Sequence, residues 1–284
     1  MSLQWYPGHM TKARRELAAL IPSQDVMIEV LDARLPRGAS NPMIAELRGG
    51  KPVIKVLTKA DLADPRATTA WIEWLEQEPG VRAFASTTAD PAAARKTLHA
   101  LARNMAQHRG PDKAVRALIA GCPNVGKSTF LNTLMNRQVA KTGDKPAVTK
   151  EQQAVTLNNG MQITDTPGLM WPKIEYEPRA FRLALAGSIP ETAIDYLTIG
   201  MFAAELFLAM YPDLVVARYK LAGVPAAPQA LLEEVGRRRG ALRKGGVIDL
   251  HKAAELLVME FRSGALGRIT LELPPADNRS LEPA

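Results

Sequence analysis

The sequence predicts an α/β fold: a mostly parallel six-stranded sheet flanked by helices in residues 1–173, followed by a small all-α domain in residues 174–284. Two observations predict it. Up to about residue 165, short apolar runs alternate with amphipathic helical patterns, as expected where crossover helices join parallel strands. Beyond Trp171-Pro172 the strand-like runs disappear and only helical patterns remain.

The composition is that of an ordinary globular protein. The 284 residues are 46 % hydrophobic and 23 % charged, which is typical of soluble domains. The only cysteine is Cys122, which excludes a disulfide framework and favours a reducing, cytoplasmic location. The first residues lack the apolar run of a signal peptide, and Asp195 and Glu205 interrupt the most apolar stretch, so no membrane span is expected.

The charge distribution favours a polyanionic partner. The formal net charge is +7. The excess lies in residues 1–172, which hold 22 Lys and Arg against 15 Asp and Glu, whereas residues 173–284 hold 14 of each. A basic balance suits nucleic acid or nucleotide, although many basic proteins bind neither.

The predicted strands of the first domain are short apolar runs that lead into polar or glycine-rich residues. They lie at residues 25–31, 52–57, 81–85 and 114–120, and a hairpin with strands at 152–157 and 161–164 follows around Asn158-Asn159-Gly160. Helical patterns between them predict helices at 10–20, 43–47, 65–78, 91–108 and 129–135. In the second domain, helices are expected at about 179–186, 191–210, 213–221, 228–239 and 249–263.

A phosphate-binding loop is predicted at residues 121–128, which read G-x-x-x-x-G-K-S between a strand and a helix. Gly126 lets the backbone turn so that successive N–H groups, including those up to Thr129, converge on phosphate oxygens. Lys127 supplies a positive charge at the β- and γ-phosphates, and the Ser128 hydroxyl is a ligand for Mg²⁺. The neighbouring Asn124 and Val125 complete the predicted loop contacts.

Two loops after apolar strands predict a guanine site. Thr58-Lys59-Ala60-Asp61 is similar to N-K-x-D, in which the final carboxylate accepts from both N1–H and N2–H₂ of guanine. Adenine lacks that donor pair, so Asp61 would select GTP over ATP, and the Lys59 stem would lie over the base. Ser86 and Thr87 occupy the place of an S-A-K element, whose backbone amides meet guanine O6. An exposed Lys/Asp loop and a helix N-cap are the alternatives.

The hairpin delivers Asp165-Thr166-Pro167-Gly168, which is a D-x-x-G element. Asp165 is expected to reach Mg²⁺ through water, and the Gly168 N–H to meet the γ-phosphate. Thr149, at the end of the polar loop 137–150, is the candidate for the threonine that ligates Mg²⁺, ahead of Thr142 because of its distance from the phosphate loop.

The order of these motifs is unusual. In most Ras-like GTPases the phosphate loop comes first, then the switch threonine, D-x-x-G, N-K-x-D and S-A-K. Here the two guanine elements precede the phosphate loop, Thr149 and D-T-P-G. The ends of a compact α/β domain lie close together, so a chain cut after D-x-x-G keeps the same fold. The sequence therefore predicts a circularly permuted Ras-like P-loop GTPase domain.

The chain resembles the circularly permuted GTPases of the ribosome biogenesis GTPase A (YlqF/RbgA) type. The resemblance rests on residues 5–10 (W-Y-P-G-H-M), Asp32-Ala33-Arg34, Asn41-Pro42, the Pro123-Asn124 pair, and residues 165–173 (D-T-P-G-L-M-W-P-K). It implies a cytoplasmic GTPase that helps the large ribosomal subunit precursor to mature, with rRNA and ribosomal proteins as partners and an RNA-binding C-terminal domain. No DNA partner is expected. Thr58 stands where the family pattern usually has Asn, at the first position of the N-K-x-D element.

Catalysis needs a group that orients the attacking water, and Leu169, directly after D-x-x-G, has no polar atom. The resemblance implies His9 for this role, with Lys127 and Gly168 at the phosphates. From the residues alone, His9 is equally a structural or RNA-contacting histidine. The resemblance also implies that Asn124 helps to hold K⁺, whereas the residues alone allow a loop-shaping Asn.

Two functions remain open from the sequence. The first is a GTP-hydrolysing ribosome assembly factor, and the second is an RNA-binding module whose GTP site is a sensor with little turnover. The dense basic run at Arg237, Arg238, Arg239, Arg243 and Lys244 fits an RNA-phosphate contact. It equally fits a solvated helix end, where basic side chains interact favourably with the helix dipole.

Overall fold

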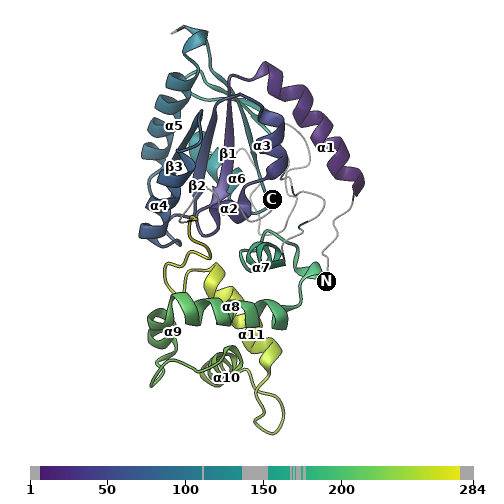
Figure 1. The fold of residues 1–284 in the computed structure, drawn as a ribbon, viewed down its shortest axis with the longest axis vertical. Helices are drawn as coiled ribbons and strands as arrows, with labels where there is room; N and C mark the ends of the chain where they lie inside the picture. The colour runs from purple at the N-terminus through teal and green to yellow at the C-terminus, as the bar shows by residue number, and fades with distance from the viewer. Residues whose placement is uncertain are drawn as a thin grey trace.

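A computed structural model describes residues 7–110, 112–135, 153–166, 168, 170, 174 and 177–275, with only the backbone for residues 7–13 and 153. Within these residues the chain forms a six-stranded sheet in the order β3-β2-β1-β4-β6-β5 (Figure 1). All neighbouring strands are parallel except β5 and β6, which form the expected hairpin. The predicted mostly parallel α/β fold is confirmed. The strands are β1 (Val26–Asp32), β2 (Val53–Thr58), β3 (Val81–Ala85), β4 (Arg116–Gly121), β5 (Gln153–Thr156) and β6 (Gln162–Asp165).

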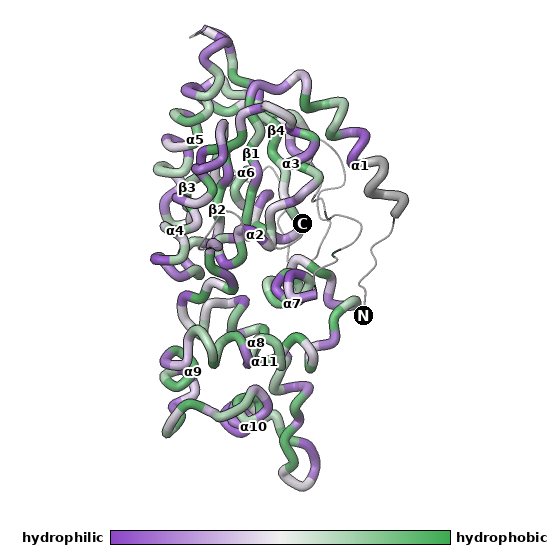
Figure 2. The backbone as a smooth tube through the Cα atoms, viewed as in Figure 1, coloured by the Kyte–Doolittle hydropathy of each residue, from purple (hydrophilic) through white to green (hydrophobic). Residues whose placement is uncertain are grey.

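Helices cover both faces of the sheet. Apolar residues of α1 (Pro7–Leu20) and α3 (Pro42–Arg48) pack on one face with Met27 and Leu118. The other face packs against α4 (Pro65–Leu75), α5 (Pro91–Met105) and α6 (Lys127–Met135). Every residue of β1 and β2 is buried, as expected for parallel strands between two helical layers, and Figure 2 shows the hydrophobic character of these central strands.

The described residues after β6 form helices and the segments that join them, as predicted. The helical region consists of α7 (Glu177–Leu185), α8 (Tyr196–Met210), α9 (Pro212–Tyr219), α10 (Pro228–Arg239) and α11 (Leu250–Arg262). Helix α8 contacts the other four helices, and its buried Phe207 meets Phe261 of α11, with ring centroids 5.5 Å apart. The hydrophobic core is continuous from the sheet into this region. The domain boundary at residue 173 stays a prediction, because residues 171–173 lie outside the described residues.

Some helix ends differ from the sequence expectation. The helix expected at 191–210 is a short 3₁₀ turn followed by α8, because Asp195 caps α8 by accepting from Thr198 N at 3.0 Å. A one-turn helix α2 (Pro36–Ala39) forms where the sequence predicts no helix, with Pro36 at the position where proline favours helix initiation. The first helix begins at Pro7 rather than at residue 10.

Among the described residues, no single helix is long and apolar enough to cross a membrane, and α8 and α9 pass that test only as a pair bent by 111°.

After α11 the chain returns to the sheet (Figure 1). Ile269 N donates to Leu62 O at 3.0 Å, and Leu271 N donates to Arg34 O at 2.6 Å. This C-terminal segment, residues 264–272, therefore contacts the loops that follow β1 and β2. Those loops and the ones after β3, β4 and β6 lie at the carboxyl edge of the sheet, which is where open parallel sheets bind ligands.

Candidate functional site

The phosphate loop connects β4 to α6 and has the backbone that the motif requires. Asn124 and Gly126 have φ angles of 57° and 96°, a region in which glycine is far less strained than other residues. A Cβ on Gly121 would lie 2.5 Å from Val30 O, so glycine lets the loop start directly beside β1. Helix α6 begins at Lys127, which directs its N-terminal N–H groups toward the loop.

Lys127 and Asp165 form a buried ion pair at the base of the loop. Lys127 Nζ donates to Asp165 Oδ1 at 2.6 Å, and the two side chains are 6 % and 1 % exposed. The glycine of the D-x-x-G element, Gly168, lies beside the phosphate loop, since a Cβ on it would be 3.1 Å from Pro123 Cα. The predicted phosphate loop and D-x-x-G element are therefore brought together.

The residues present fit a magnesium ion. Asp165 Oδ2 is buried and has no hydrogen-bond partner within the part of the chain that the structure describes. An anionic oxygen in this position is costly to leave unpaired, and water-bridged Mg²⁺ would satisfy it. Ser128 would be a direct ligand, and the ion, when bound, would offset the negative charge of the phosphates.

The loop predicted to bind guanine, residues 58–64 (called the guanine loop), begins at the last residue of β2 and lies against the phosphate loop. Thr58, which stands in place of the usual Asn, donates its hydroxyl to Val125 O and is also 2.8 Å from Leu31 O. Its side chain contacts Gly126, where a Cβ would lie 3.2 Å from Thr58 Oγ1. Thr58 is thus a structural connection between the two loops, and its hydroxyl is engaged with backbone rather than facing solvent.

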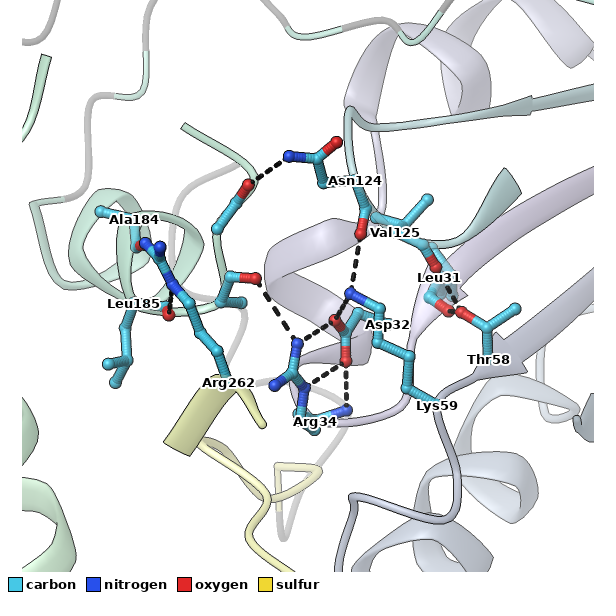
Figure 3. A network of polar contacts seen from close by, with 12 residues as sticks. Leu31, Asp32, Arg34, Thr58, Lys59, Asn124, Val125, Ala184, Leu185 and Arg262 are labelled. Atoms are coloured by element: carbon cyan, nitrogen blue, oxygen red, sulfur yellow. Dashed lines mark hydrogen bonds and ion pairs between the residues drawn. The ribbon is translucent and has the colours of Figure 1, made fainter. Parts of the chain in front are cut away.

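A network of charges centred on Asp32 holds Lys59 in place (Figure 3). Lys59 Nζ donates to Asn124 O at 2.7 Å and to Asp32 Oδ2 at 2.9 Å. Arg34 makes two side-chain hydrogen bonds to Asp32, at 2.9 and 2.7 Å. Burial alone would raise the pKa of Asp32, but the charges of Arg34 and Lys59 hold it well below its usual range. The carboxylate is therefore charged at neutral pH.

The network extends into the helical region. Arg34 Nη2 lies 3.5 Å from Ala186 O, and its guanidinium lies over the Phe261 ring at 4.8 Å. Arg262 donates to Leu185 O and Ala184 O at 3.0 and 2.8 Å. Asn124 Nδ2 donates to Gly187 O at 2.8 Å. The end of α7 is thus bonded to both the phosphate loop and α11.

Replacing Asp32 with alanine is expected to destabilise the protein by about 3–5 kcal/mol, because it leaves the buried Arg34 and the adjacent Lys59 without their anion. Urea unfolding measures this loss. The pKa of Asp32 is depressed in the folded state, so its contribution is present above about pH 4 and is lost as the pH falls further. The difference between parent and variant should therefore shrink in acid.

Glu46→Ala, which breaks the exposed ion pair with Arg14, is the matched control and should leave the unfolding midpoint nearly unchanged. An Asp32→Ala midpoint equal to that of the parent would contradict the structural role of the network.

A cavity of about 1100 Å³ lies between these loops and the helical region. It is lined by most of the predicted nucleotide-binding residues: Thr58, Lys59, Asp61, Ser86, Thr87, Asn124, Gly126, Lys127, Ser128, Thr129 and Gly168. Val125 and Asp165 are buried beside it. Thr149 and the His9 side chain lie outside the described residues, and the His9 backbone is in the first turn of α1.

Sequence reasoning missed the side of the cavity that the helical region forms, with Ala186, Gly187 and Ile189 after α7 and Met259, Arg262 and Ser263 at the end of α11. The Asp32-Ala33-Arg34 motif was visible but had no assigned role. Its partners lie far away in the sequence, so no local pattern indicates them.

The basic run of the helical region has acidic partners. Arg237 and Arg238 pair with Glu233 or Glu234 on α10, Arg239 Nε is 2.6 Å from Glu260, and Arg243 pairs with Asp249. These carboxylates offset most of the positive charge. The run therefore does not by itself make this region a basic surface.

Comparisons with known proteins agree with this site. A family model described as 50S ribosome-binding GTPase matches residues 116–194. Ribosome biogenesis GTPase A of Priestia megaterium is 37 % identical over 96 % of this chain and 98 % of its own length. The protein of the same name from Bacillus cereus is 39 % identical over 99 % and 97 %.

Solved structures agree as well. GNP-bound YlqF from T. maritima has a TM-score of 0.66 and 30 % identity, covering 92 % of this chain and 98 % of its own, and a GDP-bound YlqF structure has a TM-score of 0.67. Since relatives well above 30 % identity align with almost the whole chain, it belongs to the ribosome biogenesis GTPase A family and is a GTP-hydrolysing ribosome assembly factor.

Proposed function

We propose that this protein acts in the cytoplasm on a precursor of the large ribosomal subunit, and that contact with rRNA and ribosomal proteins stimulates its GTP hydrolysis. The observation that supports this most directly is the shared cavity, in which the nucleotide motifs form one side and the helical region the other. A change in the phosphates of the bound nucleotide therefore affects the helices on the other side of the cavity, and a ribosomal particle can contact those helices. We propose residues 174–284 as the ribosome-binding domain.

The site residues have the following proposed roles. Asp61 reads guanine, with Ser86 and Thr87 near O6 and Thr58 and Lys59 fixing the loop. Lys127 and the backbone of residues 124–129 hold the phosphates, and Gly168 N–H meets the γ-phosphate. Ser128 and Thr149 ligate Mg²⁺, with Asp165 acting through water.

Asn124 is the proposed K⁺ ligand. Its amide nitrogen donates to Gly187 O, and the amide oxygen has the chemistry that a cation prefers. A K⁺ ion there would offset charge on the β–γ bridge of GTP. The α7 end would then help to set the orientation of the Asn124 side chain.

The experiment that tests the proposed function measures phosphate release with and without purified large-subunit precursor particles, in K⁺ and in Na⁺. Low basal turnover that particles stimulate, more strongly in K⁺, is the expected result. Tight GTP binding with no turnover under any condition would instead indicate the sensor function, which the family membership does not favour. Stimulation by small-subunit particles alone would contradict the proposed partner.

Replacing Asp61 with asparagine is expected to weaken GTP binding about five- to 150-fold, because one buried donor–acceptor match is lost. The variant should gain affinity for xanthosine triphosphate, whose C2 carbonyl accepts from the new amide. Calorimetric titration with both nucleotides measures the change, and Asp112→Asn is a matched control away from the cavity. Unchanged GTP affinity in Asp61→Asn would show that another residue reads the base.

A further inference from the structure

The C-terminal segment, residues 264–272, holds the guanine loop by its backbone. Arg268 Nε donates to Ala63 O at 2.8 Å, and Arg268 Nη2 donates to Ala60 O at 2.8 Å. Ile269 N donates to Leu62 O at 3.0 Å. One side chain and one backbone amide therefore bind three carbonyl groups that lie on both sides of Asp61.

Two of the three carbonyls belong to buried residues, Ala60 and Ala63. Ala63 is fully buried and Ala60 is 6 % exposed, and a buried carbonyl without a donor costs free energy. The guanidinium suits this task because its fork of donors reaches two carbonyls in one fixed geometry. A lysine at the same position has the charge but lacks that fixed fork.

The segment is itself firmly placed. Ile269 and Leu271 are buried, and Tyr211 OH both accepts from Thr270 N at 3.1 Å and donates to Thr270 O at 3.0 Å. The Glu272 carboxylate accepts from Gly38 N at 2.8 Å, and the Glu272 backbone carbonyl accepts from Trp71 Nε1 at 2.9 Å. Arg268 therefore extends from a rigid part of the chain rather than from a loose tail.

We infer that Arg268 is a positioning residue for guanine selection, which holds the guanine loop so that the Asp61 carboxylate meets N1–H and N2–H₂ together. This inference rests on the proposed role of Asp61. A two-point contact is sensitive to the orientation of the carboxylate, because a small rotation of the loop keeps one hydrogen bond and loses the other. The helical region, through Tyr211 and the segment, thereby contacts the base-reading loop as well as the phosphate loop.

The test compares GDP with inosine diphosphate, whose base keeps N1–H and lacks the N2 amine. The ratio of the two dissociation constants therefore reports the alignment of Asp61, whereas a general loss of stability does not change it. In Arg268→Ala the preference for GDP should fall about two- to tenfold, the value of one net hydrogen bond. Arg268→Lys should keep part of the preference.

Arg243→Ala is the matched control, because Arg243 is exposed and pairs with Asp249 outside the cavity. Its GDP preference should equal that of the parent. If Arg268→Ala keeps the parent ratio, or if both affinities fall in parallel, the inference is overturned and Arg268 only supports the fold. Should Arg268→Ala fail to fold, the ratio of the two dissociation constants is measured in Arg268→Lys and Arg268→Gln instead.

Asp61→Asn, titrated with xanthosine diphosphate, separates the two possible failures. If that variant gains no xanthosine binding, the proposed reading of guanine by Asp61 is wrong, and the inference about Arg268 falls with it. If it gains xanthosine binding while the Arg268 variants keep the parent ratio, only the inference about Arg268 is wrong.

Discussion

Lys127→Ala is expected to reduce GTP turnover by at least about 100-fold, which is the usual effect of removing one group that stabilises transition-state charge. The ammonium group is lost from the position where the γ-phosphate would develop charge. The change also removes the partner of Asp165, 2.6 Å away in a buried pair. Phosphate release under saturating GTP and Mg²⁺ measures the effect.

Two further variants separate catalysis from folding. Lys127→Ala combined with Asp165→Asn removes both charges, so it should recover stability without recovering turnover. Lys252→Ala, on an exposed side chain of α11, is the matched lysine control and should hydrolyse GTP like the parent. Turnover near the parent rate in Lys127→Ala would mean that phosphate chemistry occurs elsewhere in the chain.

The Lys127–Asp165 pair also suggests how binding begins. The ammonium group of Lys127 is paired with the Asp165 carboxylate, which is proposed to serve Mg²⁺ through water. Entry of Mg²⁺–GTP would replace one buried ion pair with two new ones, Lys127 with phosphate and Asp165 with the hydrated metal. Because Asp165 ends β6, this exchange occurs where the chain leaves the sheet for the helical region.

The elements of the sheet and the phosphate loop were predictable because their signals are local. An apolar run such as residues 52–57 indicates a buried strand without reference to the rest of the chain, and the G-x-x-x-x-G-K-S spacing has few other uses. The motif order also indicated the circular permutation. The family resemblance and the GTPase function, both predicted from these motifs, are confirmed by the comparisons.

The other side of the site was not predictable, because it depends on contacts between distant residues. Arg268 meets Ala60 and Ala63 across more than 200 residues, and neither partner has a distinctive sequence pattern. Thr58 departs from the usual Asn, and the contact of its hydroxyl with the backbone of Val125 follows from packing rather than from any local pattern. A side chain's partners depend on packing, and one sequence alone does not state them.

His9→Ala is expected to leave GTP affinity nearly unchanged and to remove most of the stimulation by large-subunit particles. Leu169 has no polar atom to orient water, so another group must supply this function. A positioned general base or hydrogen-bonding group commonly contributes about 100- to 10,000-fold in rate. His9 lies in the first turn of α1, which begins at Pro7, so a particle that binds this end of the helix would set the distance between His9 and the γ-phosphate.

The measurement is phosphate release at saturating GTP with increasing amounts of particles, for the parent, His9→Ala and His9→Gln. His99→Ala, on α5 and away from the cavity, is the matched histidine control and should be stimulated fully. A glutamine can hydrogen-bond water but cannot accept its proton at neutral pH. Stimulation retained in His9→Gln would therefore indicate that His9 orients water, whereas loss in both variants would indicate proton transfer. Full stimulation of His9→Ala would mean that a group of the particle itself orients the water.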